Sequence, residues 1–321
     1  MSRVRCLHLA LTAGLLALLL WKTDVTGVTT ALRDVSPFTA ATVVALNAPI
    51  VVLFWLRSRL VLERLGHQLP ARILLPVALL GNVAGSLTPA SAGELLRTTM
   101  LKSHAGVTAK DGFALVLYER ALSVYLMALG AGVVAAFVVL PLPAASLIAA
   151  IAAPLSALPV VGGPTLLSFL PKRRLAHGPA FLQDLVERGV DVADRLEWLL
   201  RDRSLLLTWA TITGLIFGLV TAQFWLLSRA LSDAVSPQEA WLAFGVSQLA
   251  AIISLLPLGL GAADGSIAAI LRRAGMTLEQ GTAVAILVRA TITLPLGLAA
   301  VGCYLYLQRV GGTEPNTAED A

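Results

Sequence analysis

Eight apolar segments, most of them close to the length of a bilayer crossing, dominate the sequence. They cover residues 7–21, 38–56, 73–87, 113–140, 144–170, 205–231, 241–256 and 282–307. A helix needs about 20 apolar residues to cross the hydrocarbon core. Only helices and closed barrels satisfy their backbone polar groups in lipid. The segments therefore predict an all-α polytopic transmembrane helix bundle of about eight spans.

Composition supports a membrane protein and argues against a nucleic-acid partner. Hydrophobic residues make up 57% of the chain and charged residues 13%, while mean hydropathy is +0.81. These values exclude an ordinary soluble domain. The formal net charge is +5, but the bases lie between apolar segments, where anionic headgroups and the positive-inside rule explain them. We expect no nucleic acid to bind.

Neither a metal site nor a known catalytic motif is evident. Cys6 and Cys303 each lie at the edge of an apolar segment, and the four histidines are scattered without ligand spacing. Nucleophile-elbow, Walker A, kinase and zinc-protease patterns are missing. We therefore expect a protein without cofactor and without enzymatic activity. An intramembrane enzyme using Glu94 and Glu119 as acid and base remains an alternative.

The third and seventh apolar segments are short and run directly into stretches rich in proline and glycine, residues 89–100 and 257–271. Interrupted segments of this kind are typical of re-entrant helices in transporters, where protein or a wet cavity satisfies the backbone. The residues expected to shape this backbone are Pro89, Gly93, Pro257, Gly259 and Gly261.

An internal repeat includes both interrupted segments. Residues 105–120 align without a gap on residues 274–289, with six of sixteen positions identical. We predict one integral membrane domain, residues 1–310, that contains repeat units at about 71–140 and 240–308. A disordered tail, residues 311–321, follows it.

Charge predicts a multi-pass protein of the cell membrane with a cytoplasmic N-terminus. Arg3 and Arg5 precede the first apolar segment, which lacks a convincing signal-peptide cleavage site and therefore reads as an uncleaved helix. Arginines also place the loop after the second segment in the cytoplasm. The basic linker 171–203 should lie there too, yet five crossings would leave it outside. The sequence leaves open whether the charge rule or the fifth crossing fails, and whether the repeats are parallel or inverted.

The linker 171–203 has the pattern of an amphipathic helix. Phe181, Leu185, Val192, Leu196 and Leu199 recur at helical spacing, while acid-then-base pairs four residues apart follow the other side. This pattern predicts a helix on the membrane surface. A partner-binding helix is the alternative.

Six charged residues lie within or against apolar segments, where each costs about 2.5–3.5 kcal/mol at a helix centre. We interpret three as lipid- or phosphate-binding, namely Arg97, Arg120 and Arg289. The others would balance charge or bind a proton or cation, namely Glu94, Glu119 and Asp264. The simpler readings are snorkelling arginines, a capping box between Ser91 and Glu94, and Asp264 as a helix cap or as a partner of Arg289.

Taken together, these motifs resemble the lysylphosphatidylglycerol synthase transmembrane-region family of flippase-like membrane proteins over nearly the whole chain. The matching positions are Pro89, Gly93, Glu94 and Arg97, then Glu119 and Arg120, then Pro257, Gly259, Gly261, Asp264, Gly275 and Arg289. Asp264 replaces a usual glutamate, and Leu258 replaces a common glycine.

The resemblance implies movement of lipids between leaflets. Family members fused to a soluble aminoacyltransferase domain move aminoacylated phosphatidylglycerol, and stand-alone relatives are linked to glycolipids, hopanoids or polyprenyl-linked sugars. Since these 321 residues contain the membrane part alone, we expect a flippase-like protein whose partners are a membrane lipid and a separate lipid-modifying enzyme or glycosyltransferase. A non-transporting accessory subunit, docked through the 171–203 helix, is the alternative. The sequence leaves the oligomeric state open.

Overall fold

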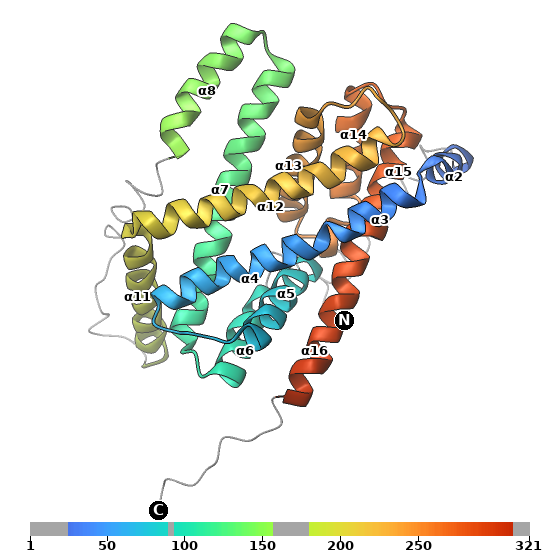
Figure 1. Cartoon of the computed structure of the whole chain (residues 1–321). Coiled ribbons are helices and arrows are strands. Elements are labelled where there is room, and N and C mark those ends of the chain that lie inside the picture. The colour runs from blue at the N-terminus through green and yellow to red at the C-terminus, as the bar shows by residue number, and fades with distance from the viewer. Residues whose placement is uncertain (1–24, 89–92, 157–179, 311–321) are drawn as a thin grey trace, which may run out of the picture.

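A computed structural model describes residues 25–88, 93–156 and 180–310, and every element in these ranges is a helix (Figure 1). In chain order they are α2 (Val25–Asp34), α3 (Pro37–Ala45), α4 (Asn47–Arg64), α5 (Ala71–Leu87), α6 (Leu95–Ala105), α7 (Ala109–Val139), α8 (Leu142–Ser156), α11 (Ala180–Arg201), α12 (Arg203–Arg229), α13 (Pro237–Ser254), η2 (Pro257–Gly259), α14 (Ala262–Arg273), α15 (Leu278–Val288), η3 (Arg289–Thr293) and α16 (Leu294–Val310). The predicted first span and the C-terminal tail lie outside the described residues.

Four helices of the described ranges are long and apolar enough to cross a membrane. They cover Pro37–Arg64, Ala109–Val139, Arg203–Arg229 and Leu278–Val310. Two shorter apolar helices accompany them, Ala71–Leu87 and Leu142–Ala152. The predicted all-α polytopic membrane bundle is therefore confirmed.

Each of the two interrupted segments forms a helical hairpin that leads into a long helix. In the first hairpin, α5 is followed by α6, and in the second α13 is followed by η2 and α14. Gly106 and Gly275, with φ of 65° and 98°, end the second helix of each hairpin, α6 and α14 respectively. Thr108 and Thr277 then cap α7 and α15 through their side chains. Both pairs of residues lie in the repeated stretches 105–120 and 274–289, so the two units use the same turn.

In each hairpin, the residues that precede the first helix lie beside those that follow the second helix. His67 precedes α5 and lies 2.9 Å from the carboxylate of Asp111 at the start of α7. Gln280 holds the position equivalent to Asp111, and its amide donates to the carbonyl of Leu231, which precedes α13, at 2.9 Å. One side chain at the same repeat position therefore closes each hairpin.

The repeat extends further upstream than the sequence interpretation placed it. Residues 54–59 of α4, Phe-Trp-Leu-Arg-Ser-Arg, match residues 224–229 of α12, Phe-Trp-Leu-Leu-Ser-Arg, at five of six positions. In both helices the final arginine lies over the tryptophan ring, at 5.4 Å for Arg59 and 5.3 Å for Arg229. The repeating unit is thus a long helix, a hairpin and a second long helix.

The two units are inverted with respect to one another. In Figure 1, α4 and α12 cross the molecule in opposite directions, as do α7 and α16. Helix α5 packs against α16, and α13 packs against α7, so each hairpin contacts the last helix of the other unit. This arrangement answers the question that the sequence left open in favour of an inverted repeat.

The described part of helix α11 packs on protein, and its place at the membrane surface stays a prediction. Leu196, Leu199 and Leu200 pack into the same hydrophobic cluster as α7. Asp191 lies 3.7 Å from Lys110 at the start of α7. The apolar side of its described part is therefore covered by protein, because periodicity identifies an apolar face without saying what covers it.

Candidate functional site

An ion pair joins the second arm of the first hairpin to the long helix behind it. Glu94 lies at the start of α6, and its carboxylate is 3.2 Å from Arg120 on α7. The side chains are 14% and 34% exposed, respectively. The absence of a side chain at Gly85 makes room for this pair, since a Cβ there would lie 2.6 Å from Glu94 Cγ. Ser91, the proposed capping partner of Glu94, lies outside the described residues.

Replacing Gly85 with alanine is expected to displace Glu94 and weaken this ion pair, with a loss of about 1–3 kcal/mol from overpacking. Thermal unfolding of the purified protein in detergent measures the effect. The matched control is Gly214→Ala in α12, where a Cβ would meet nothing within 4 Å. That control should be neutral or slightly stabilising, because alanine favours a helix over glycine. Equal midpoints for the two variants would contradict the tight fit.

The second hairpin carries an equivalent ion pair. Asp264 near the start of α14 lies 3.0 Å from Arg289, and its other oxygen accepts from the Gly261 backbone N–H at 2.9 Å. The side chains are 10% and 26% exposed. In both units the acid lies on the short arm, and the arginine follows it by 26 or 25 residues on the next helix. The acid–arginine pair is thus a repeated feature, and Asp264 both caps its helix and binds Arg289.

Beside the first pair lies a fully buried charge cluster, which we call the charged triad: Arg57, Arg97 and Glu119. Arg97 donates to Glu119 at 2.6 Å and to the hydroxyl of Ser58 at 2.6 Å. Arg57 lies 3.6 Å from the same carboxylate and covers the ring of Trp209 at 5.2 Å. The triad ties α4, α6 and α7 together.

Charge is unbalanced within the triad, because two guanidinium groups share one carboxylate. The Nε atoms of Arg57 and Arg97 are buried and have no hydrogen-bond partner in the described structure. Gly81 lets the Arg97 side chain pass, since a Cβ at this position would lie 2.6 Å from its Cδ. An excess of buried positive charge close to Glu94 and Arg120 favours binding of an anion nearby.

The second unit replaces the triad with aliphatic side chains. By the repeat alignment, the positions of Arg57, Arg97 and Glu119 correspond to Leu227, Ile267 and Val288. All three aliphatic residues are buried in one hydrophobic cluster. The counterpart of Ser58, Ser228, stays buried as well. The acid–arginine pair therefore occurs twice, and the charged triad belongs to the first unit.

A turn of π-helix positions Arg289. The segment η3 begins at this arginine, and the Thr291 carbonyl within it accepts from the Asn47 side chain of α4 at 2.8 Å. Gln223 of α12 donates to Asn47 at 3.1 Å. π-Helical turns frequently mark functional sites. Here the two long helices α4 and α12 hold the turn in place through buried amides.

The break between η2 and α14 has the strained backbone that its proline and glycines predict. Gly259 and Gly261 have φ of 60° and 80°, and Leu258 has φ of 56°. A left-handed conformation costs a side-chain-bearing residue about 1–2 kcal/mol. This conformation explains why glycine suits position 258 better than leucine. Pro257 begins η2, whereas Pro89 of the first hairpin lies outside the described residues.

The structure brings the predicted charges together in two groups. Glu94, Arg97, Glu119 and Arg120 gather at the first hairpin, and Asp264 meets Arg289 at the second. η2, at the break of the second hairpin, packs against α5 of the first. Arg97 is buried and donates to Glu119, while Arg120 and Arg289 are partly exposed.

Sequence reasoning missed Arg57 and Ser58. The repeated Phe-Trp-Leu-x-Ser-Arg hexamer was the available signal, since Arg57 is its one departure. Among the described residues, no group of three histidine, cysteine or acidic side chains could hold a metal ion.

Comparison with known proteins gives one family. Residues 5–300 match the family described as "Lysylphosphatidylglycerol synthase TM region". No curated protein matches the sequence.

Proposed function

The chain belongs to the lysylphosphatidylglycerol synthase TM region family, a membrane family linked to phospholipid handling, and from this we propose that it is a lipid translocase. Its cargo would be an anionic phospholipid, an aminoacyl-phospholipid or a lipid-linked glycan. The observation that carries the proposal is the acid–arginine pair repeated on two inverted hairpins. Buried charges inside a membrane domain are costly and mark substrate paths.

We propose that Arg120 and Arg289 bind the lipid phosphate by exchanging it for their carboxylate partners. A guanidinium group binds phosphate in bidentate fashion, as it binds a carboxylate. Without lipid, Glu94 and Asp264 neutralise the arginines, and with lipid they are free to bind a proton or a cationic headgroup. Acyl chains remain in the bilayer throughout, so only the headgroup needs a polar path. No catalytic step is required of this chain.

The same proposal treats both hairpins as re-entrant. Because each begins and ends at one end of the molecule, neither α5 nor α13 counts as a crossing. The loop before α5 and helix α11 then lie on one side, as the Arg64–Asp202 ion pair requires. With α5 not counted as a crossing, an even number of crossings precedes the linker 171–203. The linker then lies on the same side as the N-terminus, as its basic residues predict. The positive-inside rule makes that side cytoplasmic and keeps the N-terminus there.

Replacing either Arg120 or Arg289 with glutamine is expected to slow lipid flipping in liposomes by about tenfold or more. The reason is that each change removes one charge-assisted hydrogen bond, which contributes about 1.5–3 kcal/mol. Dithionite bleaching of fluorescent phosphatidylglycerol measures the rate. The matched control is Arg229→Gln, an arginine that covers Trp225 outside both pairs, and its rate should equal that of the unmodified protein.

Unchanged flipping by well-folded Arg120→Gln and Arg289→Gln proteins would refute the phosphate role. A chemically altered lipid on thin-layer analysis would favour an intramembrane enzyme. Absence of flipping by the unmodified protein, combined with capture of a partner through α11, would favour an accessory subunit.

A further inference from the structure

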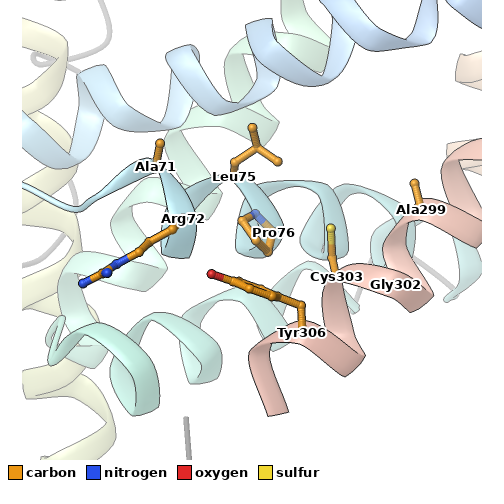
Figure 2. Close-up of a pocket in the computed structure, with 8 residues that line it drawn as sticks. All are labelled: Ala71, Arg72, Leu75, Pro76, Ala299, Gly302, Cys303 and Tyr306. Carbon is orange, nitrogen blue, oxygen red and sulfur yellow. The ribbon is translucent and has the colours of Figure 1, made fainter. Parts of the chain in front are cut away.

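An apolar groove lies between the start of α5 and the end of α16, where the two units meet. Its volume is about 480 Å³, within the range of about 300–1,000 Å³ common for ligand sites. Figure 2 shows Arg72 at one end and Ala299 at the other, with Pro76, Cys303 and Tyr306 between them. The groove thus has an apolar body and a single charged end.

The charged end is available to a ligand. Arg72 is exposed, and within the described part of the chain its guanidinium has no ion-pair or hydrogen-bond partner. The hydroxyl of Tyr306 points toward the same end (Figure 2). Tyrosine and arginine at one end of a membrane helix are typical of the headgroup region. A ligand that fits must therefore combine an aliphatic chain with an anionic group.

The inverted repeat places an equivalent groove at the opposite end of the molecule, with different chemistry. This second groove lies between the start of α13 and the end of α7, and it measures about 450 Å³. Phe137 supplies part of its apolar side, while Gln238 and Glu239 take the polar end. Glu239 already serves as the capping partner of Ser236. Because Arg72 lies at the α5–α16 groove and Glu239 at the second groove, an anionic lipid should bind at the α5–α16 groove and be repelled at the other.

We propose that the α5–α16 groove binds an anionic phospholipid from the leaflet on its side, with the phosphate on Arg72 and one acyl chain along Pro76 and Gly302. The inference rests on the proposed function, because α5 leads from this groove to the Glu94–Arg120 pair. Arg72 and Gly85 are 13 positions apart on α5, or about 20 Å at about 1.5 Å per residue. A headgroup bound at Arg72 is thus at the start of the path to Arg120.

Photo-crosslinking tests the groove directly, independently of transport. The full chain in phosphatidylcholine nanodiscs is irradiated with phosphatidylglycerol or phosphatidylcholine that carries a diazirine in one acyl chain, and adducts on the α16 peptide are quantified. The yield of adducts should be about fivefold larger with the phosphatidylglycerol probe, which is the factor expected when one arginine attracts one anionic headgroup. Arg72→Gln should remove this preference, and Gly302→Leu should lower both yields by filling the groove.

Two variants serve as matched controls. Arg309→Gln, the control for Arg72→Gln, removes an exposed base near the end of α16. Gly297→Leu, the control for Gly302→Leu, adds a side chain to α16 at a glycine with open space around it. Neither residue lines the groove, so both controls should label as the unmodified protein does.

Equal labelling by the two probes, or unchanged labelling of Arg72→Gln and Gly302→Leu, would overturn the groove proposal whatever the flipping assay shows. Selective labelling without flipping would instead support the groove and count against the translocase.

Discussion

Replacing Glu119 with valine is expected to destabilise the protein by about 3–5 kcal/mol, because removing one partner of a buried charge network strands the others. Arg97 would lose its bond of 2.6 Å and Arg57 its ion pair at 3.6 Å, leaving two buried guanidinium groups without an anion. Thermal or chemical unfolding of the purified protein in detergent would show the loss, and poor expression would accompany it.

A compensating variant makes this prediction specific to charge. The triple change Arg57→Leu, Arg97→Ile and Glu119→Val installs the side chains that the second unit carries at equivalent positions. Replacement of a whole buried ion cluster by aliphatic residues is often neutral or stabilising, so the triple variant should recover most of the lost stability. Glu119→Val alone with normal stability would show that the arginines do not depend on this carboxylate.

The second large effect is expected from Asn47→Leu. The change removes the donor to the Thr291 carbonyl and the acceptor for Gln223. The Thr291 carbonyl left without this donor costs about 1–3 kcal/mol, whereas the Gln223 amide keeps its bond to the Val43 carbonyl at 2.9 Å. Because η3 begins at Arg289, we also expect the Arg289–Asp264 pair to loosen and flipping to fall.

Asn82→Leu is the matched control for Asn47→Leu. Among the residues that the structure describes, the Asn82 side-chain amide bonds only to the carbonyl of Ala78 in its own helix, so its loss should cost less than about 1 kcal/mol. Unfolding midpoints and flipping rates of the two leucine variants are then compared. Similar small effects in both would show that the contact between α4 and the π-helical turn contributes little.

Much of the fold followed from local chemistry in the sequence. Apolar segment length indicated the long helices, and Gly106 with Thr108 marked where α6 ends and α7 begins. The duplicated pattern also indicated two related interrupted hairpins. These features depend on residues near one another in the chain, so a single sequence is enough to find them.

Partners across the bundle could not be predicted in the same way. Arg97 is one turn from Glu94, yet it binds Glu119, because the path past Gly81 leads its side chain to α7. The periodicity of helix α11 likewise did not show that Leu196, Leu199 and Leu200 pack into the hydrophobic cluster of α7. A periodic pattern marks an apolar or charged face, and only tertiary structure shows what meets that face.

The inverted duplication has a consequence for the origin of the molecule. Two fused copies with opposite orientation are the arrangement expected from duplication of a chain that inserted both ways round and associated as an antiparallel dimer. Such a chain would need little charge bias between its ends, because a strong bias of basic residues fixes one orientation. Once the copies were fused, each was free to diverge: one retained or acquired the arginines of the charged triad, and the other carries leucine, isoleucine and valine in their place. Under the proposed function, this difference between the two halves is what would let a symmetric scaffold distinguish one leaflet from the other.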